Sequence, residues 1–274
     1  MGGPATARIV SGMPRVTRLS LAPVKGMRVT AVDELELVAS GAVGDRAFLV
    51  VDDDDGLMIT SRTPALVQIA AAWDAQRGTL RLRLANGREV EEEPQLGRRA
   101  TTRLYDGREL SGRLVDGGLA DAVSEHLGRR VRLLARDADA QGADDFPVTL
   151  MSEASLQALE PALGAVPDPR RFRMTLRIDG VDAWEEHGWA GRELNVGAAV
   201  LSVVDPVPRC VVTTRDPDDG RRDAPVLKAL ATLRGKRDVT FGVWCEVVAP
   251  GRVRRGDTVV PGPPNRPRAP VRGA

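Results

Sequence analysis

The sequence predicts a mainly β protein with a few helices (α+β), built as two linked β-rich modules of which the second is a barrel. Apolar and polar residues alternate with a period of two in many places, for example Leu-Arg-Leu-Arg-Leu at residues 80–84. Turn signals such as Asn86-Gly87 separate these runs. Helical periodicity is confined to three stretches, which leaves strands as the dominant element.

In the first module, strands are expected wherever short apolar or alternating runs occur between turns. These runs are residues 35–38, 47–51, 80–84 and 131–134, and a further strand ends at Pro23. A helix is expected over residues 118–127, because Leu119, Val123 and Leu127 recur at helical spacing. The acidic run at residues 52–55 lacks the ligand spacing of a calcium loop, so we interpret it as a solvated hairpin tip.

In the second module, Ser152 is a good N-cap for a helix over residues 152–163, and a third helix is expected over residues 224–233. The remaining apolar runs predict strands. They cover residues 173–178, 194–203, 211–214, 240–248 and 258–260.

The module boundary is expected after Arg136, where residues 137–145 are small, polar and predicted to be mobile. The modules then span residues 14–136 and 145–261. Residues 262–274 are rich in proline and poor in apolar groups, which predicts a disordered tail.

The amino-acid composition excludes several classes of function. A net charge of +1 over 274 residues gives no electrostatic reason to expect binding to nucleic acid or to a membrane surface. The two cysteines form no disulfide framework or zinc quartet, and the two histidines cannot supply a zinc site by themselves. The sequence shows neither a signal peptide nor the ~18 apolar residues of a membrane helix, so a cytoplasmic protein is expected.

Cys210 is the most informative single residue. Arg209 precedes it directly, and the β-branched run at residues 211–214 follows before an Asp216-Pro217-Asp218 turn. A cation beside a thiol favours the thiolate, which attacks electrophiles and binds soft metals. A cysteine in an apolar strand is also often a small buried residue, so both interpretations stay open.

Several cationic residues lie near the ends of predicted strands. A lysine or arginine at such a position is commonly a solvated surface charge, yet four of them together would suit a phosphate. They are Lys25, which is followed by Gly26, and Arg46, Arg62 and Arg173. The sequence does not establish that these side chains converge.

Several sequence pieces occur in a familiar order between residues 16 and 261. They are Pro23-Val24-Lys25, Asp45-Arg46-Ala47-Phe48, Leu150-Met151-Ser152-Glu153-Ala154-Ser155-Leu156, Arg171-Phe172-Arg173, Arg209 to Asp218, and Phe241-Gly242-Val243. Together they resemble MOSC proteins with an attached N-terminal β-barrel domain, the group that includes the mitochondrial amidoxime-reducing component and its bacterial relatives. The match is specific because the pieces recur along the whole folded chain.

The resemblance implies the molybdenum cofactor (molybdopterin) as the bound group, with Cys210 as both the catalytic residue and the protein thiolate on molybdenum. Further residues would hold the phosphate and pterin of the cofactor. These are Lys25, Gly26, Arg46, Arg62, Arg173, Thr175 and Arg209. Pyridoxal phosphate binding is a further property that the family carries.

Two positions depart from the family pattern. Relatives often have serine where this chain has Gly26, and Arg-Pro-Asn where it has Arg173-Met174-Thr175. Each change alters one cofactor hydrogen bond, a loss of roughly 0.5–1.5 kcal/mol if the bond is direct.

The resembling enzymes reduce N-hydroxylated compounds at molybdenum, which predicts a molybdenum-dependent oxidoreductase acting on a small N-hydroxylated substrate. Electrons would come from a separate protein, either ferredoxin, flavodoxin or a cytochrome b5-like protein with its reductase. Asp216 or Asp218 could protonate the departing oxygen, although the Asp-Pro-Asp sequence better suits a turn.

Two other functions stay open. A non-catalytic carrier or sulfur-transfer module for the molybdenum cofactor could use the same cysteine, since MOSC domains also occur attached to cofactor sulfurases. A metal-free cysteine enzyme would need His126 or His187 as its base. Cys245, which lies in an apolar run beside Trp244, is expected in the core.

Overall fold

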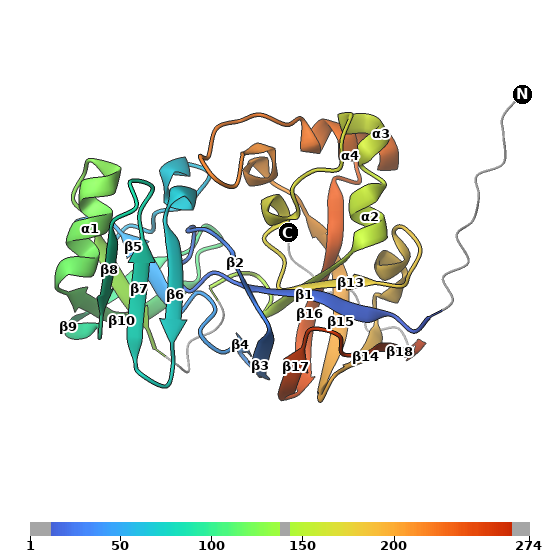
Figure 1. Ribbon diagram of the computed structural model, residues 1–274, viewed down its shortest axis with the longest axis horizontal. Helices are drawn as coiled ribbons and strands as arrows, with labels where there is room; N and C mark the ends of the chain where they lie inside the picture. The colour runs from blue at the N-terminus through green and yellow to red at the C-terminus, as the bar shows by residue number, and fades with distance from the viewer. Residues whose placement is uncertain (1–11, 138–142, 265–274) are drawn as a thin grey trace, which may run out of the picture.

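The computed structural model describes residues 12–137 and 143–264 of the chain. Strands outnumber helices, which confirms the predicted mainly β, α+β class. The strands form four sheets, and within the described residues none of these closes into a barrel. Figure 1 shows two halves side by side, with cyan and green segments on the left and orange and red segments on the right.

The largest sheet has eight strands and forms the centre of the right-hand half. Its members in chain order are β1 (Arg15–Leu21), β2 (Thr30–Val32), β12 (Val148–Ser152), β13 (Leu176–Asp179), β14 (Arg192–Val196), β15 (Ala199–Pro208), β16 (Thr240–Ala249) and β18 (Val259–Pro264). The strand order is β18-β14-β15-β16-β12-β13-β1-β2, and β12 and β13 are its parallel pair.

Three smaller sheets complete the strand framework. One joins β17 (Gly251–Arg254), β3 (Glu34–Val38) and β4 (Gly41–Ala42). The second has the order β5 (Phe48–Val51), β11 (Arg132–Arg136), β10 (Glu109–Asp116) and β9 (Gln95–Arg103). The third joins β6 (Ala70–Asp74), β7 (Thr79–Arg83) and β8 (Glu89–Glu92).

Helices are few and short. The α-helices are α1 (Gly118–Leu127), α2 (Glu153–Gln157), α3 (Glu160–Leu163) and α4 (Val226–Arg234). The 3-10 helices are η1 (Pro64–Gln68), η2 (Pro169–Phe172), η3 (Glu185–Trp189) and η4 (Val211–Thr214). The bounds of α1 agree with the predicted helix, and Gly128 ends it in the left-handed conformation that favours glycine.

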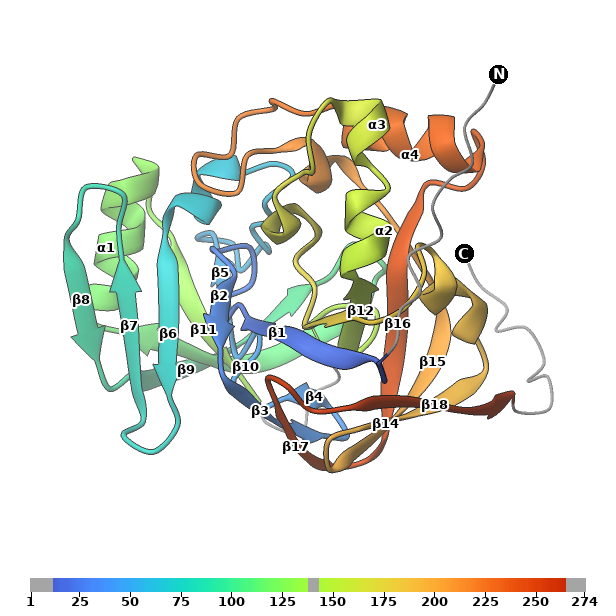
Figure 2. The same cartoon turned by 45° about the vertical axis from the view of Figure 1, so that its right-hand side comes forward.

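The first strand belongs to the sheet of the second half. β1 pairs antiparallel with β13, placing Leu19 opposite Leu176, and both side chains are buried in one core. β3 likewise pairs with β17, near the C-terminal end of the described chain. In Figure 2, β1 runs from the right-hand half toward the left-hand half. The turn after β1 is therefore held where the two halves meet.

Among the described residues three further hydrophobic cores hold the remaining elements, and two of them pack the helices. In the left-hand half, α1 packs on the sheets through Leu119 and Val123, which lie in one cluster with Phe48 and Leu82. In the right-hand half, a cluster under α2 and α4 includes Phe172 and Phe241, whose rings stack with centroids 4.0 Å apart. This stacking anchors η2, which leads directly into Arg173.

Some predicted elements differ in the structure. Residues 211–214 form the 3-10 helix η4 rather than a strand, because the amide of Arg215 turns back to the carbonyl of Val212. Residues 173–175 precede β13 instead of opening it. The run at residues 194–203 is the β14–β15 hairpin, and its turn contains Gly197 with φ +55.

The helix and tail predictions also need correction. The helix over residues 152–163 is broken into α2 and α3, and Pro161 lies in the first turn of α3. Residues 262–264 belong to β18, where Pro264 is opposite Arg192, so they are not a disordered tail. Residues 265–274 and the linker residues 138–142 lie outside the described chain.

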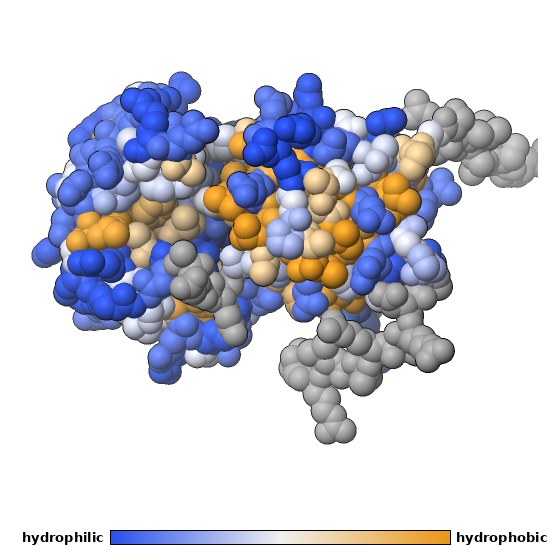
Figure 3. All heavy atoms as spheres, turned by 90° about the horizontal axis from the view of Figure 1, so that it is seen from below, coloured by the Kyte–Doolittle hydropathy of each residue, from blue (hydrophilic) through white to orange (hydrophobic). Residues whose placement is uncertain are grey.

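The surface is mixed in polarity. Seen from below in Figure 3, apolar side chains gather over the centre and right, whereas hydrophilic ones dominate the left. Val248 and Val260 are among the exposed large apolar residues. Within the described residues, the structure contains no helix with the length and apolar character that a membrane span requires.

We expect Leu19→Ala to lower the free energy of unfolding by about 2–5 kcal/mol, because it opens a cavity in the core that joins β1 to β13. The measurement is urea unfolding followed by far-UV circular dichroism. Arg18→Ala, at the exposed neighbouring position, should change it by less than about 0.5 kcal/mol. Equal effects of the two substitutions would show that β1 does not depend on this core.

Candidate functional site

Cys210 lies at the surface where β15 ends and η4 begins. Its carbonyl accepts hydrogen bonds from the amide of Thr213 at 3.2 Å and from the Thr213 hydroxyl at 2.9 Å, which fixes the turn. The interpretation of Cys210 as a buried residue in an apolar strand is therefore wrong. Cys245 does lie in the core, and burial raises the pKa of its thiol to about 12.

Arg209 is held beside Cys210 by contacts with the η2 segment. It donates to the carbonyl of Phe172 at 2.6 Å, and its guanidinium lies over the Phe172 ring, 5.5 Å from the centroid. Burial lowers its pKa to about 10, although the charges of Cys210 and Asp144 act in the opposite direction. Its Nε is buried and has no hydrogen-bond partner among the described residues.

Arg173 ends η2 in the left-handed conformation, with φ 54, which is uncommon for a residue with a side chain. Burial lowers its pKa to about 10, and the nearby charges of Arg46 and Arg209 lower it further, while Asp144 and Asp45 raise it. Arg173 forms no ion pair with another described residue. It therefore adds positive charge between Arg46 and Arg209.

Lys25 and Arg46, both from the first half, meet at the carboxylate of Asp144. Lys25 Nζ pairs with one oxygen of Asp144 and donates to the carbonyl of Ala143 at 2.7 Å. Arg46 Nε pairs with the other oxygen, and Arg46 also pairs with Asp45. Burial alone would raise the pKa of Asp144, but Arg46 and Lys25 together hold it below its usual range.

The backbone around this cluster is unusual. Arg46 has φ 48, and its carbonyl accepts from Arg136 Nε at 3.0 Å. Gly26 has φ +89, and an added Cβ there would lie 3.0 Å from Leu66 Cδ1. Glycine therefore suits this turn.

Two recesses border the cluster. The first is lined by Arg46, Asp144 and Thr175 among others, which brings Thr175 beside the two charged residues. The hydroxyl of Thr175 is 3.3 Å from that of Thr149. The second recess lies between segments of both halves and is lined largely by arginines. They are Arg28, Arg170, Arg171, Arg173 and Arg215.

The structure thus brings together most of the predicted site residues. Arg173 is close enough to Arg46 and Arg209 for their charges to affect its pKa, and the charge of Asp144 acts on all three arginines. Lys25 belongs to the same region because it pairs with Asp144, and Cys210 because its charge acts on Arg209. Arg62 is the exception: its side chain is exposed, and within the described chain no hydrogen bond or ion pair joins it to this cluster. Its backbone amide donates to the carbonyl of Ile59 at 3.0 Å.

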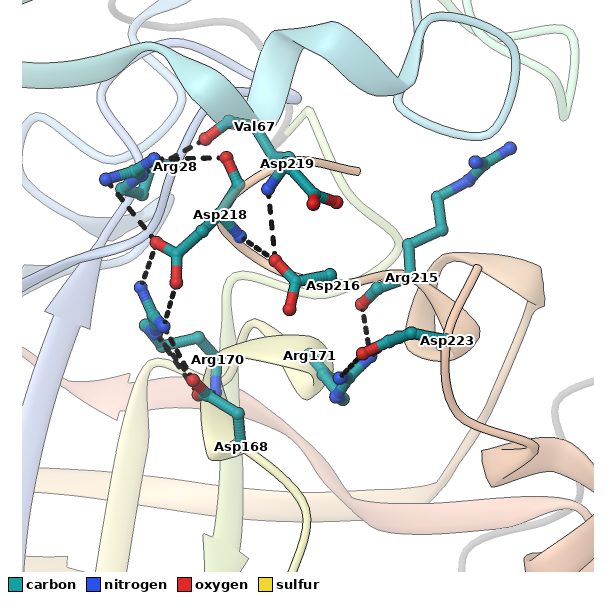
Figure 4. A network of polar contacts seen from close by, with 10 residues as sticks. All are labelled: Arg28, Val67, Asp168, Arg170, Arg171, Arg215, Asp216, Asp218, Asp219 and Asp223. Atoms are coloured by element: carbon teal, nitrogen blue, oxygen red, sulfur yellow. Dashed lines mark hydrogen bonds and ion pairs between the residues drawn. The ribbon is translucent and has the colours of Figure 1, made fainter. Parts of the chain in front are cut away.

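Asp216 and Asp218 have structural contacts. Asp216 Oδ1 accepts from the amides of Asp218 and Asp219 at 2.8 and 3.0 Å, which is the turn-forming role that the Asp-Pro-Asp sequence predicts. Asp218 lies between Arg28 and Arg170 in Figure 4, and the hydrogen bonds from Arg170 lower its pKa. A carboxylate held in this way is a poor proton donor.

Asp144 is the main site residue that sequence reasoning missed. Its small, polar neighbours predict a mobile linker. Residues 143 to 145 are instead ordered against the first half, with Ala143 buried. Their position just before the apolar residues of β12 (Val148–Ser152) could have indicated that they are ordered, but that strand was not predicted from the sequence.

Neither histidine supports a metal-free cysteine enzyme. His126 Nε2 is 3.3 Å from the carbonyl of Ala65, and His187 packs edge-on against Trp184. Burial lowers the pKa of His187 to about 4. In the part of the chain that the structure describes, neither ring forms a hydrogen bond with Cys210.

Sequence comparison then assigns the chain to a family. The MOSC domain matches residues 137–260, and the MOSC N-terminal beta barrel domain matches residues 13–130. The chain belongs to the MOSC family and carries both of these domains.

Its curated relatives include two amidoxime-reducing proteins. Mitochondrial amidoxime-reducing component 1 of Xenopus laevis is 29% identical, covering 89% of this chain and 81% of that protein. Mitochondrial amidoxime reducing component 2 of Homo sapiens is 27% identical, covering 93% and 86%. Molybdenum cofactor sulfurase of Caenorhabditis elegans is 25% identical over 88% of this chain but only 34% of that protein.

Among solved structures, the YUAD protein from Bacillus subtilis is similar with a TM-score of 0.44 and 12% identity. The match covers 90% of this chain and 94% of that one.

The residues present fit a molybdopterin. Its phosphate needs cationic donors, and Lys25, Arg46 and Arg173 provide them. The metal would need a soft ligand, and Cys210 is an exposed thiol beside Arg209. The unpaired, buried Nε of Arg209 is a donor that an anionic ligand would satisfy.

We expect the stabilising effect of Asp144 to depend on pH. The pKa of Asp144 is lower in the folded protein than in the unfolded chain, where it is near 3.9. Its contribution to the free energy of unfolding is therefore full above that unfolded pKa and is lost as the pH falls toward the folded pKa. Asp144→Asn should cost about 0.5–1 kcal/mol at pH 7, since the side chain is 37% exposed and solvent screens its pairs.

The measurement is the difference in melting temperature between wild type and Asp144→Asn from pH 7 to pH 2.5. The difference should shrink below about pH 4. Asp54→Asn, at an exposed position, is the control and should show little difference at any pH. A difference for Asp144→Asn that is constant with pH would contradict the assigned ion pairs.

Proposed function

We propose that this protein binds the molybdenum cofactor between its two halves and reduces N-hydroxylated compounds with electrons from a separate protein. The observation that carries the proposal is the exposed Cys210 thiol beside Arg209, which in turn lies near Arg173; neither arginine forms an ion pair with another described residue. Such an arrangement combines a soft metal ligand with uncompensated positive charge. Relatives named for amidoxime reduction support the choice of reaction.

Each half contributes a different part of the site. The second half supplies the Cys210 thiolate as the metal ligand, and Arg173 and Thr175 as hydrogen-bond donors to the pterin or phosphate. The first half supplies Lys25 and Arg46, whose ammonium and guanidinium groups would bind the phosphate. When bound, the cofactor would supply two-electron reduction chemistry at molybdenum, which Cys210 would hold through its thiolate.

The protein positions these groups before any ligand arrives. Asp144 and Asp45 pair with Lys25 and Arg46, which keeps two long cationic side chains ordered. Arg209 is held by the carbonyl of Phe172 at 2.6 Å. Ordering these chains in advance reduces the entropy that binding must overcome.

We propose that the electrons come from another protein. The 274 residues contain two cysteines, too few for the four thiolates of an iron–sulfur cluster within them. We propose a ferredoxin, a flavodoxin or a cytochrome b5-like protein as the donor class.

A carrier or sulfur-transfer module is the second candidate. It is favoured by the exposure of Cys210, which a sulfur-transfer partner could reach, and by the similarity to a molybdenum cofactor sulfurase. A carrier would release the cofactor readily and would reduce no amidoxime.

We expect wild-type protein from a cofactor-competent host to contain about one molybdenum per chain, and Cys210→Ala to contain at least about tenfold less, because even residues behind a metal ligand change metal affinity by that factor. The measurement is metal content by mass spectrometry, together with reduction of an amidoxime by a chemically reduced donor. Cys245→Ala is the control thiol and should retain the metal. Equal metal in wild type and Cys210→Ala would contradict the assigned ligand, and bound cofactor without turnover would favour the carrier.

A further inference from the structure

The loop that follows Cys210 is held by contacts from both halves of the protein. Arg170 of η2 donates to both carboxylate oxygens of Asp218, at 2.8 and 2.7 Å. From the first half, Arg28 NH1 is 3.5 Å from Asp218 Oδ1, and Arg28 NH2 donates to the Asp218 carbonyl at 3.2 Å. Figure 4 shows Asp218 between the two guanidinium groups.

Neighbouring contacts reinforce this junction. Gln68 donates to the carbonyl of Asp219 at 2.9 Å, and Arg215 donates to the carbonyl of Ser61 at 3.1 Å. Both contacts join the loop to the first half. Arg28 Nε also donates to the carbonyl of Val67 at 3.1 Å, so its guanidinium is fixed independently of Asp218.

The three segments that meet at Asp218 are those that carry the proposed cofactor residues. Arg28 lies three residues after Lys25, and Arg170 lies three residues before Arg173. Asp218 itself is joined to Cys210 through the short η4 turn and the Asp216 turn. The Asp218 carboxylate therefore contacts the lysine and arginine segments at the same time and joins both to the cysteine segment.

We propose that Asp218 is a positioning residue for the cofactor site. It holds the Cys210 segment at a fixed distance from the Lys25 and Arg173 segments by pairing with Arg28 and Arg170. The expected effect on cofactor binding rests on the proposed function. The expected effect on the loop itself can be measured in cofactor-free protein.

The solvent exposure of the Asp218, Arg170 and Arg28 side chains distinguishes a positioning role from a contribution to global stability. The side chains of Asp218, Arg170 and Arg28 are 53%, 37% and 31% exposed. Pairs this exposed contribute little to global stability because water screens them. Their main effect is then on the relative placement of the segments that they join, which matters for a ligand that contacts all three.

The test compares Asp218→Asn with Asp219→Asn. Asp219 lies in the same loop, but its carboxylate pairs with the exposed Arg221, which belongs to the same loop. Asp218→Asn should lower molybdenum per chain roughly tenfold while the melting temperature stays within about 4 °C of wild type. Asp219→Asn should change neither quantity, and Asp218→Glu should recover part of the metal.

A second measurement uses cofactor-free protein, so that failure of the proposed function does not affect it. Hydrogen exchange of residues 215–220 and the rate of Cys210 alkylation by iodoacetamide should both rise several-fold in Asp218→Asn and not in Asp219→Asn. Arg28→Gln should reproduce the effect from the opposite half.

Unchanged exchange and alkylation in Asp218→Asn would overturn the positioning role, as would equal effects of the two asparagine variants. If wild-type protein binds no molybdenum, but hydrogen exchange still rises in Asp218→Asn relative to wild type, the proposed function is rejected. The role of Asp218 in positioning the Cys210 segment is then kept.

Discussion

The pairing of β1 with β13 is the interaction on which the site depends most. It places the first strand in the sheet of the second half, so the turn that follows, with Lys25 and Gly26, begins beside residues 173–175. The amide of Ser20 donates to the carbonyl of Thr175 at 2.9 Å, which continues the contact to the edge of the site. This pairing therefore gives the cations of the first half and the thiol of the second a common frame.

Only some of the cations within this frame are paired with carboxylates. Asp144 and Asp45 pair with Lys25 and Arg46, whereas Arg173 and Arg209 are desolvated and form no ion pair with a described residue. Desolvated cations are costly unless they meet an anion or hydrogen-bond acceptors. A dithiolene ligand with a phosphate supplies such an anion, which is why a MOSC-type cofactor accounts for the arrangement better than a metal-free thiol does.

The sequence predicted the strand-rich class and α1, because alternation and helical spacing are local signals. Through their resemblance to family motifs it also singled out Lys25, Arg46, Arg173 and Cys210 as candidate site residues, and their role in cofactor binding stays a prediction. It failed for η4, because the β-branched run after Cys210 favours a strand locally while Thr213 and Arg215 close a turn. Asp144 and the Arg28–Asp218–Arg170 junction were not predicted, since such contacts join residues more than 45 positions apart.

The central claim is that Cys210 and the Lys25, Arg46 and Arg173 cations enclose one molybdenum cofactor. Anomalous diffraction at the molybdenum edge, from crystals of wild-type protein loaded with cofactor, tests this most directly. The account predicts a molybdenum peak at bonding distance from Cys210 Sγ, with the cofactor phosphate against Lys25 and Arg46. A molybdenum peak away from Cys210, or a phosphate remote from both cations, would contradict it.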